Sequence, residues 1–116
     1  MNDLIQNFIM SRLPIAGLAA YSVHTANAVI QCQPLSRSLY AATVEQMLTT
    51  VVKNGLALMP SGGRSAHYCW TFEAQQVFVA ARADGFALAL LMENNVSVQL
   101  SSVKDILKSF LELQEG

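Results

Sequence analysis

Hydrophobic residues recur at helical spacing at the start of the chain. The apolar positions are Leu4, Ile5, Phe8 and Ile9, with Asn2 or Asp3 before them as a cap. Pro14 follows, and because proline cannot continue a helix, the pattern predicts a short amphipathic helix that ends before it.

Two apolar runs after this helix predict two β-strands, over 15–23 and 28–33. Asn27 lies in the short segment between them. It accepts the left-handed backbone that a tight turn requires, so the two strands should form a hairpin. Pro34 ends the second strand.

The next segment has the pattern of a long helix over 37–59, with Ser36 as its cap. One face is apolar and carries Tyr40, Val44, Met47, Leu48, Val51 and Val52. The opposite face is polar and carries Glu45, Gln46, Thr49 and Lys53. At about 1.5 Å per residue the helix would span about 30 Å, enough to cross a small sheet.

Three further strands are expected in the second half of the chain. Aromatic and more polar residues alternate over 66–73, which predicts a strand with one aromatic face. Its aromatic residues are Tyr68, Trp70 and Phe72. A strand over 76–83 leads through Asp84-Gly85, a signal of a two-residue hairpin, into a strand over 86–92. This last strand has no polar residue, so it should lie mid-sheet between two layers of helices.

Ser101 or Ser102 caps a final helix, whose apolar face carries Val103, Ile106, Leu107, Phe110 and Leu111. The order of elements is therefore α-β-β-α-β-β-β-α. Because the central strand is apolar on both faces, this order predicts an α+β fold in which helices flank one five-stranded antiparallel sheet. We expect a single domain over 1–116.

The composition narrows the classes of protein to consider. The chain has 116 residues, of which 53% are hydrophobic and 13% charged, with a net charge of −1 and a pI of 6.0. Such a chain buries enough surface to fold, and it lacks both an apolar stretch of about 18 residues and a basic cluster for nucleic acid. Soluble domains average about 25% charged residues. Part of this surface is therefore expected to be covered by another chain.

Cys32 and Cys69 lie far apart without the paired ligands of a structural zinc site. Two buried free thiols in a cytoplasmic protein are the favoured interpretation, and a single disulfide is the alternative. The apolar run after Arg12 and the segment 26–28 resemble a signal peptide, but Asp3 cancels the positive charge that such a leader requires. We therefore expect a cytoplasmic location.

Candidate catalytic groups are scarce. His24, expected in a turn, and His67, expected on a strand, are far apart and have no paired acid at a telling spacing. Cys69 shares a strand face with His67, but the sequence supplies neither an orienting third group nor an oxyanion loop. The glycine-rich loop 61–64 lacks the lysine of a phosphate-binding loop. We predict no enzyme activity and no catalytic, cofactor-binding or metal-binding residue.

Five segments carry a resemblance to a known family: 17–21, with the sequence GLAAY, then 37–59, 76–83, 86–92 and the helix from Ser102. In their order and length they resemble the roadblock/dynein-light-chain family, which has a profilin-like fold related to the longin domains. The resemblance spans the whole chain and rests on element order and apolar patterning. It departs from the family at the first hairpin turn, where Thr25-Ala26-Asn27 replaces a frequent acidic residue and glycine.

The resemblance implies a homodimer, because in that family the third strand pairs with its counterpart at a sheet edge while the long helices pack side by side. The residues agree, since 66–73 contains no lysine or proline that would protect a free edge. The expected interface residues are Gln46, Thr49, Thr50, Lys53, His67, Tyr68, Cys69 and Trp70. Two alternatives are open: the aromatic side chains face the helices as core, and the polar helix residues form a solvated face.

The resemblance also implies a non-enzymatic interaction module that regulates, or serves as a scaffold for, a small Ras-like GTPase. It would present a surface shared by two copies that favours one nucleotide state. One alternative is a profilin-like or PAS-like sensory domain that holds a small apolar ligand between sheet and helices. Another is a purely structural subunit of a larger complex.

Overall fold

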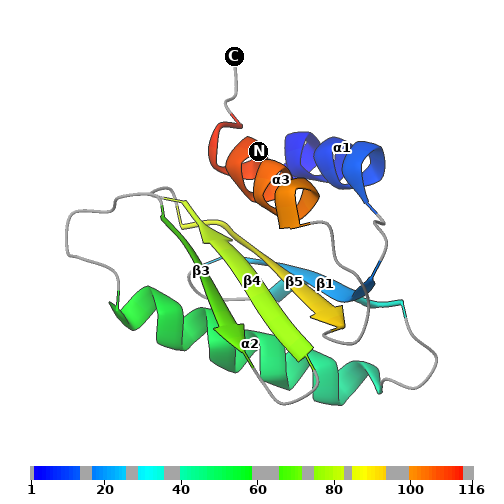
Figure 1. Ribbon diagram of the computed structural model, residues 1–116, viewed down its shortest axis with the longest axis vertical. Coiled ribbons are helices and arrows are strands. Elements are labelled where there is room, and N and C mark those ends of the chain that lie inside the picture. The colour runs from blue at the N-terminus through cyan, green and yellow to red at the C-terminus, as the bar shows by residue number, and fades with distance from the viewer. Residues whose placement is uncertain are drawn as a thin grey trace.

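Eight helices and strands make up the described part of the chain, in the order that the sequence predicts. The computed structural model in Figure 1 describes residues 2–13, 17–25, 29–35, 40–58, 66–71, 75–82, 85–93 and 100–113. The elements are α1 (Asn2–Arg12), β1 (Leu18–His24), β2 (Val29–Pro34), α2 (Ala41–Leu58), β3 (Ala66–Thr71), β4 (Gln75–Ala81), β5 (Ala87–Glu93) and α3 (Leu100–Leu111). The strands form one antiparallel sheet in the order β2-β1-β5-β4-β3, so the predicted α+β fold is confirmed.

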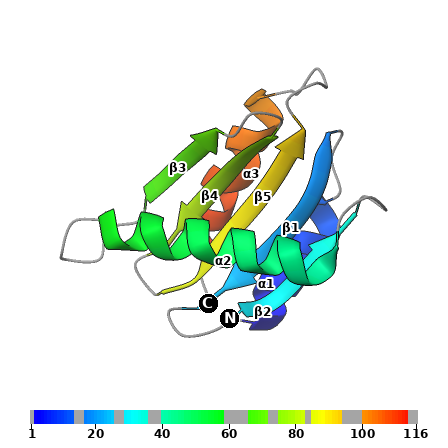
Figure 2. The same ribbon diagram turned by 90° about the horizontal axis from the view of Figure 1, so that it is seen from below.

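Helices cover both faces of this sheet (Figure 1). α2 packs against one face, and α1 and α3 pack against the other. In Figure 2, which views the molecule from below, α2 lies in front of the sheet and crosses it from the β2 edge at its start to the β3 edge at its end. None of the helices in the described ranges is long and apolar enough to cross a membrane.

β5 lies at the centre of the sheet and is buried on both faces, as its apolar sequence predicts. Toward α1 and α3 it presents Leu88, Leu90 and Met92, and toward α2 it presents Ala87, Ala89 and Leu91. All these side chains are at most 1% exposed. Burial of each large one contributes about 1.5–3 kcal/mol, so the two helical layers are stabilised chiefly by what they cover.

The first strand begins later than predicted. β1 starts at Leu18, and Gly17 before it has a φ of 84°, a left-handed conformation that glycine adopts without strain. The Gly17 carbonyl accepts a hydrogen bond of 3.0 Å from the N–H of Glu93, so the turn is tied to the end of β5. The prediction of a strand from residue 15 took no account of this glycine.

The hairpin between β4 and β5 is wider than the predicted two-residue turn. The N–H of Arg82 donates to the Phe86 carbonyl at 2.8 Å, so three residues lie between this bonded pair. Gly85 has a φ of 95°, as expected for the last residue of a three-residue hairpin loop. The Asp-Gly signal was right about the turn and wrong about its length.

Three side-chain predictions are also wrong. Tyr40 precedes α2 and is 81% exposed, so it does not belong to the buried stripe, although Val44, Leu48, Val51 and Val52 do. Cys69 is exposed and Cys32 is partly buried; both are free thiols, so the prediction of two buried thiols fails for Cys69. His24 ends β1 and is 2% exposed, where a turn was expected.

Some predicted features cannot be compared with the structure. The cap Ser36, the turn residue Asn27 and the aromatic Phe72 lie outside the described residues. α3 begins at Leu100, one residue before the first expected cap.

Arg82 joins the β4–β5 hairpin to the end of α3. Its guanidinium donates to the Phe110 carbonyl at 2.5 Å and to the Leu113 carbonyl at 2.6 Å. Its Cζ also lies 5.7 Å from the centre of the Phe110 ring. Carbonyls at a helix C-terminus have no partner within the helix and carry partial negative charge, so a cation stabilises them.

We expect Arg82→Met to lower the free energy of unfolding by about 1.5–3 kcal/mol, because hydrogen bonds from a charged donor are lost. Arg12→Met is the matched control. Arg12 also lies over a ring, 5.8 Å from the centre of Phe8, but its hydrogen bond to Ser109 is exposed and measures 3.4 Å. The control should lose less than about 1 kcal/mol. Urea unfolding measures both variants, and equal losses would contradict the role given to Arg82.

Candidate functional site: the β3 edge and the outer face of α2

β3 is an edge strand of the sheet. One side pairs with β4 in the register that aligns Tyr68 with Val79 and Trp70 with Val77. Within the described ranges no strand pairs with its other side. An unpaired edge offers a row of backbone N–H and C=O groups to another chain.

The register shows which residues of β3 direct these groups outward. In an antiparallel sheet, successive residues direct their backbone groups to alternate sides. The N–H of Arg82, the residue after β4, donates to the carbonyl of Phe86, the residue before β5. Alternate residues of β4, counted back from Arg82, therefore bond to β5. The intervening residues Val77, Val79 and Ala81 therefore bond to Trp70, Tyr68 and Ala66 of β3. The outward groups belong to the other three residues of β3, which are His67, Cys69 and Thr71.

The side chains of β3 divide between the two faces of the sheet. Tyr68 and Trp70 are half-buried and pack against the cluster beneath α2. The Tyr68 hydroxyl donates to the Val52 carbonyl of α2 at 3.3 Å, and burial raises the pKa of Tyr68 to about 12. These two aromatic side chains thus belong partly to the core, which is one of the alternatives that the sequence leaves open.

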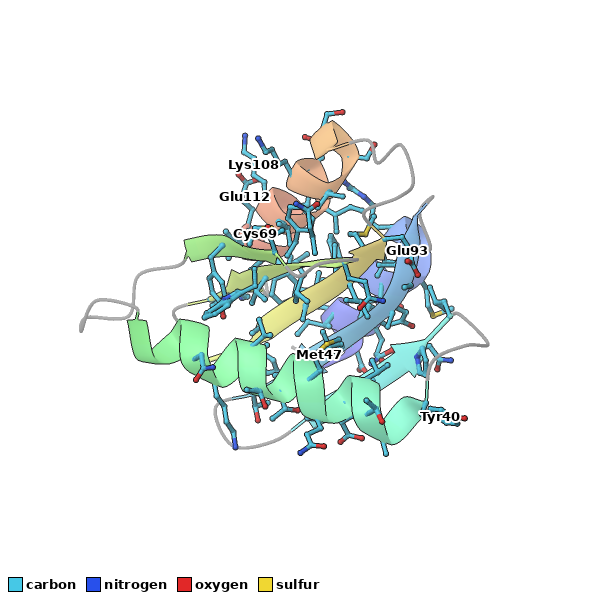
Figure 3. The ribbon with its side chains drawn as sticks, turned by 60° about the horizontal axis from the view of Figure 1, so that its bottom comes forward. Tyr40, Met47, Cys69, Glu93, Lys108 and Glu112 are labelled. Carbon is cyan, nitrogen blue, oxygen red and sulfur yellow. The ribbon has the colours of Figure 1, made fainter. Side chains whose placement is uncertain are left out.

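Cys69 and Thr71 lie on the opposite face and are exposed. Figure 3 shows Cys69 on the side of the sheet away from α2. Partial burial raises the pKa of the Cys69 thiol, and a hydrogen bond with Thr71 acts in the opposite direction. The backbone of His67 pairs with Ala80, but its side chain lies outside what the structure describes.

The expected interface residues on α2 form a separate group. Val44, Leu48 and Val52 face the sheet, so Gln46, Thr50 and Lys53 project to the solvent side. The Thr50 hydroxyl donates to the Gln46 carbonyl at 2.9 Å, and Thr49 is half-buried on the flank of the helix. One described hydrogen bond links β3 to α2, between Tyr68 and Val52, the neighbour of Lys53. The expected interface residues therefore lie on two adjacent elements, β3 and the outer side of α2.

The other edge of the sheet, β2, is protected. The N–H of Leu35 donates to the Ala19 carbonyl of β1 at 2.8 Å. By alternation Pro34, the residue before it, faces outward, where it has no N–H to offer. From the sequence, Pro34 predicts only the end of a strand. That it leaves the outer edge of β2 without an N–H follows from the β1–β2 register, which the sequence does not show.

A buried polar pair lies at the end of β1. Ser22 and His24 are both buried, and the Ser22 hydroxyl lies 2.6 Å from His24 Nε2. Burial lowers the pKa of His24 to about 4, so the ring is neutral at pH 7. Because both side chains are buried and bonded to each other, this pair has no access to a substrate and acts as a satisfied polar pair in the core.

Cys32 of β2 packs against the buried cluster between the sheet and α2. Burial first, and then the charge of Glu45, raise the pKa of the Cys32 thiol, so it is a poor nucleophile. In the described part of the chain, no group of three or more His, Cys, Asp and Glu residues could hold a metal ion. The open edge of β3 presents unpaired backbone groups to another molecule.

Neither a protein-family model nor a curated protein matches this sequence. Among solved structures, the Roadblock/LC7 domain from Streptomyces avermitilis is similar, with a TM-score of 0.51 and 14% identity. The match covers 94% of this chain and 92% of that one. The chain has the Roadblock/LC7 fold. This is the fold that the sequence resemblance implied, and β3 holds the edge position expected of the third strand.

Stability should fall in acid because of His24. Its pKa is about 4 in the folded chain and about 6.5 when unfolded, so the unfolded chain binds the extra proton between these values. We expect the free energy of unfolding to be fully retained above pH 6.5 and to fall by up to about 3 kcal/mol toward pH 4. Urea unfolding between pH 4 and 7 measures this slope. His24→Gln should flatten it, and an unchanged slope in that variant would assign the effect to other groups.

Proposed function

We propose that this chain acts by binding rather than by catalysis, as a homodimer joined through the β3 edge that serves as an interaction module for a small Ras-like GTPase. The observation that supports a dimer is the difference in outward backbone groups between the two edge strands, β2 and β3. β2 places Pro34 outward, whereas the outward groups of β3 come from three residues that include no proline, lysine or acid. An edge of this kind is suited to pairing with another strand.

The identity of the partner strand follows from symmetry. Most oligomers of soluble proteins are closed assemblies of identical chains, and an edge strand that pairs antiparallel with its own copy satisfies both edges at once. The low charge of the chain, 13%, supports the same proposal, since a surface of this kind is suited to burial.

The dimer would create a surface shared by two chains. When two strands pair antiparallel in one sheet, the two-fold axis is perpendicular to the sheet, so both α2 helices lie on the same face. Their outer residues, among them Gln46, Thr50 and Lys53, then form a polar platform. The sequence resemblance to the roadblock/dynein-light-chain family supports a GTPase as the partner for this module, and the Roadblock/LC7 fold of the chain is consistent with that resemblance.

Arg82 is not placed to act directly in catalysis on that partner. A trans-acting arginine finger needs a free guanidinium. Arg82 is held by two carbonyls at the end of α3, whereas Arg12 makes one exposed hydrogen bond of 3.4 Å to Ser109. Arg37 and Arg64 lie outside the described residues. We therefore expect selection of a nucleotide state rather than a large increase in hydrolysis.

Cys69→Pro tests the β3 edge. It removes an outward N–H in the middle of the strand and leaves the bonds to β4 intact. Because two such bonds are lost in a symmetric dimer, the dissociation constant should rise at least about tenfold. Cys69→Ser keeps the N–H and should remain dimeric. Light scattering over a dilution series measures both, with circular dichroism to check the fold. A folded Cys69→Pro variant that dimerises as well as Cys69→Ser would place the interface elsewhere.

The GTPase part has a separate test. A candidate small GTPase is loaded with GDP or with a non-hydrolysable GTP analogue, and its binding to the dimer is measured by calorimetry. We expect tighter binding of one nucleotide state, with a hydrolysis rate changed less than about tenfold. No binding in either state would remove the GTPase from the proposal and leave the dimer standing.

A further inference from the structure

We propose that two copies of β3 pair in the register that centres on Cys69, which lies on the two-fold axis of the dimer. This inference rests on the proposed dimer and adds its register. It follows from the backbone directions, since the outward groups of β3 belong to His67, Cys69 and Thr71.

Symmetric antiparallel pairing allows few registers. Outward residues must meet outward residues, so a single residue always lies on the axis. If this residue is Cys69, then Cys69 pairs with itself and His67 pairs with Thr71 of the other copy, twice. Each pair exchanges two hydrogen bonds, so the three pairs use every outward group of the described strand.

The neighbouring registers use fewer of these groups. With Tyr68 on the axis, His67 pairs with Cys69 of the other copy, and Thr71 extends beyond the start of the partner β3. With Trp70 on the axis, Cys69 pairs with Thr71 and His67 extends beyond the end of the partner β3. Either shift leaves one outward residue of each strand without a partner among the described residues 66–71. The Cys69 register therefore forms the largest number of backbone hydrogen bonds between the described residues of the two strands, and each such bond stabilises the pair.

The side chains on the α2 face agree with the Cys69 register. Tyr68 of one copy then lies opposite Trp70 of the other, in pairs without mutual backbone bonds, where side chains approach most closely. Tyr68 is held by its hydrogen bond to Val52, and both aromatic residues are half-buried within one chain. The partner would cover the remaining aromatic surface on each side of the axis.

On the opposite face, the register brings the two Cys69 side chains together. Residues of a directly bonded antiparallel pair have Cα atoms about 5.5 Å apart, within the range that a disulfide accepts. In either neighbouring register the two Cys69 residues are displaced by two positions, about 6–7 Å further along the strand. Disulfide formation between copies therefore reports the register.

The test uses the full chain with Cys32→Ser, which leaves Cys69 as its single cysteine. Copper-phenanthroline oxidises the two thiols, which lose two electrons and two protons to form one disulfide, with dissolved oxygen as the final oxidant. The reaction is run at mildly alkaline pH, because partial burial raises the pKa of Cys69. We expect most of the chain to double its apparent mass on a non-reducing denaturing gel.

The matched control carries Cys32→Ser, Cys69→Ser and Thr71→Cys. Its two thiols would lie four positions apart along the strands, about 13 Å, and should crosslink little. A mixture of this control with the variant Cys32→Ser, Cys69→Ser, His67→Cys should crosslink between the two kinds of chain, since positions 67 and 71 are paired in the proposed register.

Light scattering of each reduced sample separates the two proposals. A dimer in which Cys69 fails to crosslink overturns the register and leaves the proposed dimer intact, whereas a monomer overturns both. If a variant does not fold, the wild-type chain is oxidised and its linked peptides are identified by mass spectrometry. A Cys69–Cys69 peptide supports the register, and dimers linked only through Cys32 contradict it.

Discussion

The exclusion of water from both faces of β5 is the constraint on which the rest of this fold depends. A strand with Leu88, Leu90 and Met92 on one face and Leu91 on the other cannot remain at a sheet edge or beneath a single layer. It requires strands on both sides and helices above and below. The remaining elements meet these requirements: β1 and β4 flank β5, α2 covers the face that is rich in alanine, and α1 and α3 share the other.

Much of this architecture can be predicted from the sequence, because it depends on the local periodicity of apolar residues. The unbroken apolar run at 86–92 predicts a central strand, and the amphipathic pattern before and after it predicts the covering helices. The failures have a different origin. The burial of His24 results from a strand that continues one residue into an apparent turn, and the late start of β1 depends on the backbone of Gly17. Both depend on contacts with β5, which sequence periodicity does not contain.

The candidate site shows the same division more sharply. The sequence shows directly that β3 contains no proline or lysine. It does not show which way each backbone N–H and C=O points, which becomes known only from the hydrogen bond between Arg82 and Phe86, next to β4 and β5. Because backbone groups alternate in direction along each strand, this one bond and the pairing register give the direction of the groups on β4 and then on β3. Pro34 has meaning for the same reason, since only the register places its missing N–H at the outer edge of β2. The pattern of polar residues predicts which strand is exposed, whereas the sheet register determines which backbone groups of that strand another strand can reach.

The position of α3 late in the sequence also matters during synthesis of the chain on the ribosome. Ribosomes release a protein from its N-terminus, so β5 emerges before α3, which covers its Leu88, Leu90 and Met92 face together with α1. Until α3 is complete and Arg82 binds its terminal carbonyls, that face of the nascent sheet is exposed to other chains. The order of synthesis therefore leaves this apolar face without the α3 part of its cover until that helix has emerged, and during this interval the face can contact other chains.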